Sequence, residues 1–196
     1  MKESEGGMRL AGAKIALLIE SDYYEPEIFY YERRLKEEGA DLHIMSRLWN
    51  QPSLTFTGHE WKVPLVCNRS FEGMTDGQLR GYSAILVPSG MVADRLRYSE
   101  DLRVLPPATE LLRRAFAEPS IVKGIICHGL MILSVVPDLL RGRRVTAHNN
   151  LYGDVKNMGA IYTDRDVVVD CDLVTARAAE QAPAFMRTLI DLLASV

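Results

Sequence analysis

Short apolar runs alternate along the chain with stretches whose apolar residues recur at helical spacing. The runs at 14–19, 82–87 and 121–126 are mostly apolar, which is typical of strands buried on both faces of a parallel sheet. Less continuous runs predict further strands at 41–46, 145–147, 167–170 and 173–176.

A helix is expected after the first strand. Pro26 suits a first helical turn, and Gly39 supplies a C-terminal stop. Between these two residues, one face of the expected helix carries Ile28, Tyr31 and Leu35.

The same spacing predicts helices at 111–117 and 182–193. Strands and helices in alternation indicate a parallel sheet that is covered by helices on both faces. In such a sheet the ligand site lies beyond the carboxyl ends of the strands, so we expect functional residues directly after strands.

The segment 48–81 interrupts this alternation. Turn-forming residues, among them Pro52 and Gly58, separate two extended stretches at 54–56 and 61–66. We therefore expect a β-hairpin and a long loop there, as a candidate lid. Residues 1–12 are expected to form a flexible tail, and residues 13–196 a single domain.

Composition narrows the class of protein. A chain of 196 residues with 47% hydrophobic and 25% charged residues fits one ordinary globular domain. With 23 Lys and Arg against 26 Asp and Glu, the net charge is −3, so we expect no nucleic-acid partner. No apolar run approaches the roughly 20 residues that a membrane span needs. The polar, acidic first residues lack the apolar middle of a secretory signal, which favours the cytoplasm.

The three cysteines and the short motifs limit the possible chemistry. Cys67, Cys127 and Cys171 are widely spaced and odd in number, which indicates neither a disulfide framework nor a zinc site. The sequence has no Gly-x-Gly-x-x-Gly, P-loop or His-Glu-x-x-His pattern. We therefore expect no cofactor and no metal.

Cys127 is the one candidate nucleophile. It ends an apolar strand and is followed by His128, Gly129 and apolar residues that predict a helix. A nucleophile at such an elbow is pushed out of the sheet, and Gly129 makes room for the crossing backbone. The helix N-terminus favours thiolate and can lower a cysteine pKa from about 8.5 to roughly 3.5–7.5. The alternative is an inert thiol in the core.

With these residues, the chain resembles the ThiJ/PfpI family of the glutamine amidotransferase-like superfamily, over about residues 14–193. Residues 126–129 resemble the family's nucleophile motif, and residues 141–146 and 167–175 follow at its usual distances. The resemblance implies a flavodoxin-like three-layer α/β/α sandwich with a mostly parallel central sheet and a nucleophile elbow.

The resemblance also implies catalytic residues. In the family, a glutamate at the start of the first helix hydrogen-bonds the cysteine sulfur, and Glu27 matches it. In the peptidase-like branch, an acid after a Pro-Gly-Gly turn reaches the histidine across a subunit interface, and Asp94 matches it. The implied triad is Cys127, His128 and Asp94 of a neighbouring chain, which predicts a homodimer or a higher homo-oligomer. Considered alone, Glu27 would only complement the helix dipole, and Asp94 would be a surface charge.

The remaining site residues surround the same turns. We expect the backbone N–H groups of Gly90 and His128 to form an oxyanion hole. Ser89 replaces the first glycine of the family's turn but keeps an N–H, and Gly129 completes the elbow. His148 matches a position where some relatives have a pocket histidine, and it is either site-lining or structural.

The predicted function is that of a PfpI-type cysteine hydrolase acting on peptide, amide or glycated-protein bonds, with a small-molecule or peptide substrate and a role in stress protection. One alternative is glyoxalase-like conversion of methylglyoxal. Another is a noncatalytic stress sensor or chaperone, in which Cys127 is oxidised to sulfinate and held by Glu27. Leu130 and Asn149 stand where the family usually has proline, which leaves the substrate open.

Overall fold

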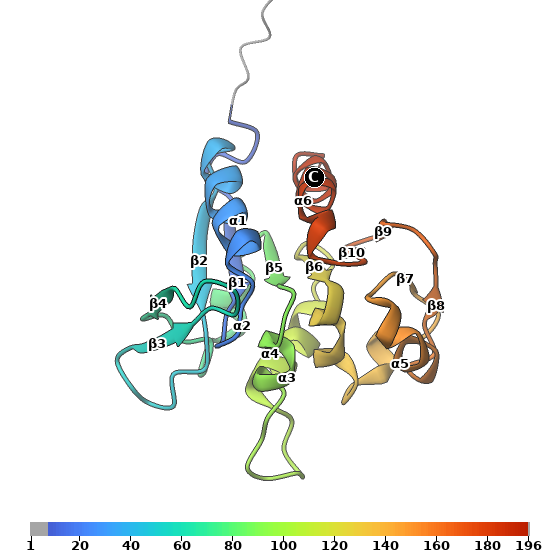
Figure 1. The fold of residues 1–196 in the computed structure, drawn as a ribbon, viewed down its shortest axis with the longest axis horizontal. Coiled ribbons are helices and arrows are strands. Elements are labelled where there is room, and N and C mark those ends of the chain that lie inside the picture. Colours follow the sequence, from blue (N-terminus) through green and yellow to red (C-terminus); the bar gives the residue numbers. More distant parts are fainter. Residues whose placement is uncertain (1–7, 196) are drawn as a thin grey trace, which may run out of the picture.

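A six-stranded sheet forms the centre of the computed structural model, which describes residues 8–195 (Figure 1). The strands lie in the order β2-β1-β5-β6-β10-β9. Their bounds are β1 (Lys14–Leu18), β2 (Asp41–Met45), β5 (Ala84–Val87), β6 (Val122–Ile126), β9 (Val167–Asp170) and β10 (Leu173–Ala176). The first five strands in this order run parallel, and β9 runs antiparallel to β10. The predicted, mostly parallel sheet is thus confirmed.

The register of the sheet brings several strand ends together. Val87 of β5 pairs with Ile125 of β6, and Ala176 of β10 pairs with Ile126. Because these strands are parallel, the segments that leave their carboxyl ends emerge at one edge. Every residue of β5 and β6 is buried, as their apolar sequences predict.

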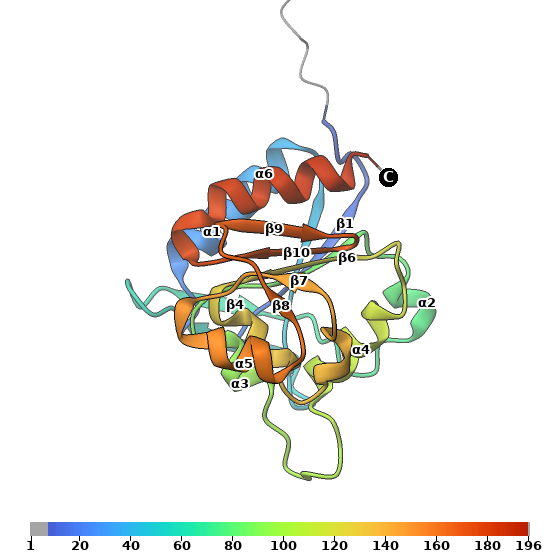
Figure 2. The same cartoon turned by 90° about the vertical axis from the view of Figure 1, so that its right-hand side faces the viewer.

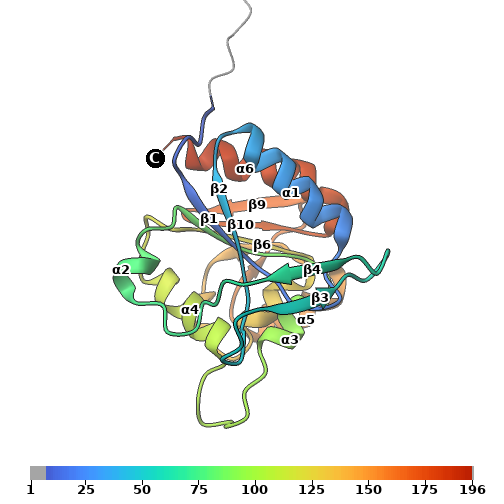
Figure 3. The ribbon, with the colours of Figure 1, turned by 90° about the vertical axis from the view of Figure 1, so that its left-hand side faces the viewer.

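Helices cover both faces of the sheet and give three layers (Figures 2 and 3). One face carries α1 (Glu25–Glu37) and α6 (Ala182–Leu193), which also contact each other. The opposite side carries α2 (Asp76–Leu79), α3 (Val92–Leu96), α4 (Pro107–Phe116) and α5 (Tyr152–Asn157). The helix predicted at 111–117 begins earlier, because Pro107 occupies its first turn. The short helices α2, α3 and α5 are too brief for a periodic signal.

The strand predicted at 145–147 differs from the observed one. Strand β7 (Arg144–Val145) stays outside the central sheet and pairs with β8 (Ile161–Tyr162). The next residue, Thr146, donates its N–H to the Thr175 hydroxyl of β10 at 2.9 Å. A side-chain oxygen therefore replaces the backbone carbonyl that would accept this N–H in a sheet, and the strand ends.

The predicted hairpin is present. Strands β3 (Leu54–Thr57) and β4 (Pro64–Cys67) pair antiparallel, with Leu54 opposite Cys67. The following loop contains α2, which begins with a capping box between Thr75 and Gln78. The tip of the hairpin lies beside the N-terminal end of α1 (Figure 3).

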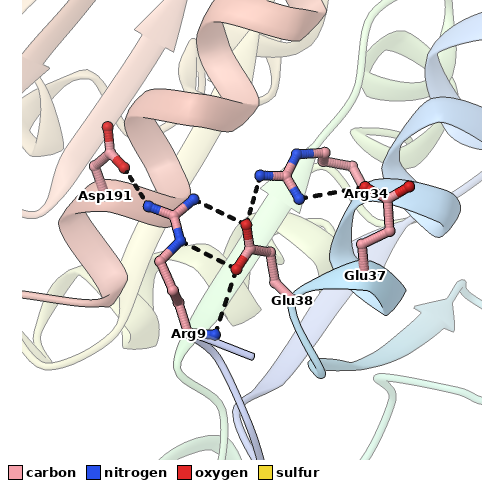
Figure 4. Close-up of polar contacts among 5 residues, drawn as sticks. All are labelled: Arg9, Arg34, Glu37, Glu38 and Asp191. Carbon is pink, nitrogen blue, oxygen red and sulfur yellow. Dashed lines mark hydrogen bonds and ion pairs between the residues drawn. The ribbon is translucent and has the colours of Figure 1, made fainter. Parts of the chain in front are cut away.

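The tail expected at 1–12 is anchored where the structure describes it, while residues 1–7 lie outside the described part. Leu10 is buried and donates its N–H to the Glu38 carbonyl at 2.9 Å. The Arg9 guanidinium contacts the Glu38 carboxylate at 2.8 Å and Asp191 at 2.7 Å (Figure 4). A buried apolar side chain and ion pairs to Glu38 and Asp191 thus hold Leu10 and Arg9 in a segment that was expected to be flexible.

Within residues 8–195, no helix combines the length and the apolar character needed to cross a membrane.

Candidate active site

A cavity of about 330 Å³ lies at the carboxyl edge of the sheet. Its lining comes from segments that follow β1, β5, β6, β7 and β10, together with the turn of the hairpin: Asp22, Tyr24, His59, Glu60, Ser89, Gly90, Cys127, His128, His148, Ala178, Ala179 and Glu180. Larger hollows of about 520 and 470 Å³ lie elsewhere on the surface, but neither is lined by Cys127 or a neighbouring candidate residue. The chemistry of the residues, rather than cavity size, therefore identifies the site.

Cys127 occupies a strained turn. Its φ of 57° lies in the left-handed region, which residues other than glycine rarely adopt. A Cβ on Gly129 would lie 2.9 Å from the carbonyl oxygens of Val87 and Pro88, so only glycine fits beneath the crossing backbone. Both features match the backbone geometry of the predicted elbow, and the role of Cys127 as a nucleophile stays a prediction. The helix that follows is a 3-10 helix (Cys127–Leu133), not an α-helix.

The His128 ring faces the Cys127 sulfur. Its Nδ1 lies 3.3 Å from the Cys127 sulfur, so a proton can pass between them. The other side of the ring packs on His148, with 4.6 Å between the ring centroids. Burial, together with His148, lowers the pKa of His128. A neutral His128 at pH 7 can therefore accept the thiol proton. His148 lines the cavity and also accepts the Asn150 N–H at its Nδ1, at 3.3 Å.

Glu27 is buried at the floor of the site, with 2% of its surface exposed. Its carboxyl accepts a hydrogen bond from the Ser89 hydroxyl and a second one, at 3.2 Å, from the Ser89 N–H. Burial outweighs these hydrogen bonds and raises the pKa of Glu27 to about 7. The hydroxyl of Tyr31, which is buried without a hydrogen bond, lies near the same carboxyl.

These contacts refine two expectations. The hydrogen bonds found for the Glu27 carboxyl go to Ser89, whereas the resemblance implies one to the sulfur. The Ser89 N–H is occupied by Glu27, so Ser89 acts by holding the carboxyl. Gly90 is free for the predicted oxyanion role: among the described residues, no acceptor is bonded to its N–H. Its φ of 78° and the Asp22 carbonyl, 2.7 Å from any added Cβ, require glycine.

The thiol is less acidic than the elbow position suggests. Burial raises the pKa of Cys127 to about 11, and the nearby carboxyls of Glu27 and Glu180 act in the same direction. The N–H groups of His128 and Ala179 oppose this rise without overcoming it. The expected low pKa is therefore wrong, because the sulfur is buried and two carboxyls lie near it. At neutral pH the site holds a thiol beside a neutral imidazole.

Asp94 does not reach this cavity within its own chain. It lies on α3 and pairs with Arg97 at 2.7 Å, with 42% of its side chain exposed. Its role across a subunit interface stays a prediction.

Seven residues of the lining are not among the predicted site residues, and four of these seven, Asp22, His59, Glu60 and Glu180, are acidic residues or a histidine. Asp22 and Glu180 follow β1 and β10, so the rule that placed Cys127 after a strand could also have found them. His59 and Glu60 belong to the hairpin turn, whose position over the site depends on tertiary contacts. In residues 8–195, no group of three or more His, Cys, Asp or Glu side chains is arranged to hold a metal ion.

The DJ-1/PfpI family model matches residues 13–192 of the chain. Among curated proteins, the deglycase PfpI of Pyrococcus furiosus is 32% identical over 181 residues, covering 92% of this chain and 99% of the relative. The protein/nucleic acid deglycase 2 of Escherichia coli K12 is also 32% identical over 181 residues, covering 92% and 97%.

Solved structures show the same fold. DJ-1beta of Drosophila melanogaster superposes with a TM-score of 0.76 at 17% identity, covering 94% of this chain and 92% of that chain. DJ-1 of Schizosaccharomyces pombe gives 0.74 at 19% identity, covering 91% and 90%. The flavodoxin-like sandwich is thus confirmed.

Proposed function

The chain belongs to the DJ-1/PfpI family, and we propose that it is a cysteine-dependent deglycase, which removes carbonyl adducts such as those of methylglyoxal from amino, guanidino or thiol groups. The observation that carries the proposal is the 3.3 Å contact between the Cys127 sulfur and His128 Nδ1 at a strained elbow that opens into a cavity. The names of the relatives in Pyrococcus furiosus and Escherichia coli support the substrate class.

The first step exchanges the amine for the enzyme's sulfur. His128 takes the proton of Cys127, and the sulfur bonds to the carbon that carried the nitrogen. The amine leaves with a proton from His128, so the thiol proton ends on the product. The neutral state of His128 supports this step, because the buried thiol does not ionise by itself at neutral pH.

The second step releases the carbonyl fragment. For a methylglyoxal adduct, a proton moves from the sulfur-bearing carbon to the neighbouring carbonyl carbon through an enediol. This internal redox exchange leaves a thioester of a hydroxy acid. Water then cleaves the thioester and restores the thiol. His128 and Glu27 are the available proton carriers, and a Glu27 pKa of about 7 suits such a shuttle.

The developing oxyanion needs donors in the same cavity. We assign this role to the N–H groups of Gly90 and His128, which flank the nucleophile from β5 and β6. The free Gly90 N–H supports this assignment.

We also propose that Asp94 of a second copy completes the site by orienting His128. Asp94 is partly exposed, and Met91, Tyr98 and Leu102, which lie within eight residues of it in the sequence, also expose much of their surface. The loop that holds Leu102 projects from the body between α3 and α4 (Figures 1, 2 and 3). Mixed Cys127→Ala and Asp94→Ala subunits should therefore regain activity after verified exchange; no recovery would refute the shared site.

The three free cysteines suit a cytoplasmic, reducing setting.

The test of the proposed activity compares wild type, Cys127→Ala and the control Cys171→Ser, whose exposed thiol lies outside the site. The substrates are the methylglyoxal adduct of N-acetylarginine, its hemithioacetal with N-acetylcysteine, free methylglyoxal and an unmodified peptide. Adduct loss in wild type and Cys171→Ser should exceed the spontaneous dissociation rate, and Cys127→Ala should not exceed it. A rate limited by spontaneous release, with rapid consumption of free methylglyoxal, would replace the deglycase with a glyoxalase. Peptide cleavage alone would replace it with a peptidase.

A further inference from the structure

The turn between β3 and β4 wraps around one buried carboxylate. Glu25, at the start of α1, is fully buried, yet no cation pairs with it among the described residues. Its oxygens accept the N–H of Glu60 at 2.9 Å, of Trp61 at 2.9 Å and of Val63 at 3.4 Å. Three N–H donors of one turn thus converge on a single side chain from another element.

The shape of the turn follows that of the carboxylate. A Cβ on Gly58 would lie 2.0 Å from Glu25 Oε1 and 2.1 Å from its carboxyl carbon. Gly58 has no positive φ, so its glycine is required by space and not by backbone conformation. With Glu25 in this position, the first residue of the turn, Gly58, therefore has no room for a side chain.

Further contacts tie the turn to the segment between β1 and α1. The Tyr23 hydroxyl donates to the Val63 carbonyl at 2.6 Å, and the His59 N–H donates to the Tyr23 carbonyl at 2.8 Å. This segment leads directly into the helix that carries Glu27. The turn and the floor of the active site are thus held by one short stretch of chain.

The turn is also a wall of the active cavity. His59 and Glu60 line it together with Cys127 and His128, whereas Glu25 does not line it. From this arrangement we propose that Glu25 is a positioning residue: it holds the turn 58–63 in place, so that His59 and Glu60 determine which adducts reach Cys127. The substrate part of this inference rests on the proposed deglycase function; the positioning of the wall does not.

The charge state of Glu25 suits this role. Burial alone raises its pKa, but the backbone N–H groups, including those of Glu60, Trp61 and Val63, outweigh burial and hold the pKa below its usual value. The carboxylate therefore stays ionised at neutral pH, when hydrogen bonds from N–H groups to it are strongest. Glu27, two residues later, lacks such a set of donors and shifts in the opposite direction.

The first test measures amide hydrogen exchange in Glu25→Ala and Glu25→Gln, with Glu37→Gln as the matched control on the exposed face of α1. Exchange at Glu60 and Trp61 should rise by about tenfold or more in Glu25→Ala, less in Glu25→Gln, and not in the control. Gln keeps one acceptor oxygen but turns an NH2 toward an N–H donor, hence its intermediate effect. Unchanged exchange at the turn, or an equal rise across the central sheet, would show that Glu25 does not hold the turn 58–63 in place.

A double-mutant cycle tests the fit between residues 58 and 25. Gly58→Ala should loosen the turn through the clash with the carboxylate. Adding it to Glu25→Ala should cause little further loosening, because the clashing atoms are gone. Additive effects would show that the two residues act separately and would contradict the proposal.

A test of the wall itself needs no turnover. The alkylation of Cys127 by iodoacetamide and by a bulky maleimide is followed by peptide mass spectrometry. The maleimide-to-iodoacetamide rate ratio should rise several-fold in Glu25→Ala and in His59→Ala/Glu60→Ala, with little further rise when all three changes are combined. An unchanged ratio would refute the wall. A changed ratio in a protein that fails to deglycate would uphold the wall and refute only the proposed function.

The effect on specificity is read from kinetics with the N-acetylarginine adduct. Glu25→Gln should raise KM several-fold and leave kcat within about twofold, since the reacting groups are untouched. His59→Ala/Glu60→Ala should do the same. A fall in kcat with unchanged KM would place Glu25 in the chemistry and contradict its positioning role.

Discussion

The two ends of α1 hold buried glutamates with opposite properties. Glu27, in the first turns, is 2% exposed, and its pKa is raised to about 7. Glu38, just past the last turn, is 7% exposed, and its pKa is lowered to about 2. The Arg9 and Arg34 guanidiniums at Glu38 outweigh burial there (Figure 4), whereas at Glu27 burial outweighs the uncharged donors Ser89 and Tyr31.

The difference shows which physical effect prevails. A helix dipole favours a negative charge at the N-terminus, where Glu27 lies, and disfavours one at the C-terminus, near Glu38. Both pKa values move against this preference. The dipole contributes about 0.3–1 kcal/mol, whereas a shift of one pKa unit corresponds to about 1.4 kcal/mol. Burial and ion pairs therefore decide the charge of these residues: Arg9 and Arg34 pair with Glu38, and in residues 8–195 no cation pairs with Glu27.

Removing the ion-paired carboxylate should have the largest effect on stability. Glu38→Ala leaves Arg9 and Arg34 without their shared acceptor, and we expect it to lower the free energy of unfolding by about 2 kcal/mol at pH 7. Urea unfolding measures the loss, and kcat/KM below the unfolding transition should stay within about twofold. A large fall in kcat/KM would link this end of the helix to the site and contradict the comparison.

The same variant tests the pH dependence. A carboxyl whose folded pKa is depressed stabilises the protein above its unfolded pKa of about 4.5, and this stabilisation is lost as pH falls toward 2. The stability difference between wild type and Glu38→Ala should therefore shrink from pH 5 to pH 2. A difference that stays constant over this range would show that the pKa of Glu38 is ordinary.

Glu27→Gln should give the opposite sign, with a smaller effect. A carboxyl with a raised folded pKa costs stability as pH rises from about 4.5 to 7, because the folded state holds the proton longer. The neutral amide avoids this cost, so the variant should gain about 1–2 kcal/mol over wild type at pH 8, and little at pH 4.5. Thermal unfolding at both pH values measures this gain. A variant less stable than wild type at pH 8 would refute the raised pKa.

Glu37→Gln should have the smallest effect. Glu37 pairs with Arg34 three residues earlier, but 70% of its side chain is exposed. Water screens such pairs, so we expect a change within about 0.5 kcal/mol at any pH. A larger change in the free energy of unfolding, measured with urea, would show that exposure to water does not explain why Glu37 differs from the buried Glu27 and Glu38.

Much of this arrangement follows from local sequence. The apolar runs predict β5 and β6, and the cysteine followed by His128 and Gly129 predicts the elbow, because buried strands and tight turns need particular residue types at fixed positions. The family resemblance points to Glu27 and Asp94. The fold and the turn that holds Cys127 were therefore accessible from the sequence, and the nucleophilic role of Cys127 stays a prediction.

Long-range contacts carry the rest. The thiol pKa was mispredicted because burial of the sulfur beside Glu27 and Glu180 depends on three separate segments. Arg9 reads as part of a polar tail until Glu38 and Asp191 lie beside it. The N–H groups that Glu25 holds belong to a turn more than 30 residues away in the chain. The spacing of apolar residues along the sequence does not predict such contacts.

The most direct test of a protonatable carboxyl near Cys127 is a pH titration of glutamate side-chain carboxyl carbons by NMR, in wild type and in Glu27→Gln. One resonance that is absent from the variant should titrate near pH 7, while that of Glu38 should remain ionised down to about pH 2. A Glu27 resonance that titrates near its usual value of about 4.5 would contradict the proton shuttle beside Cys127.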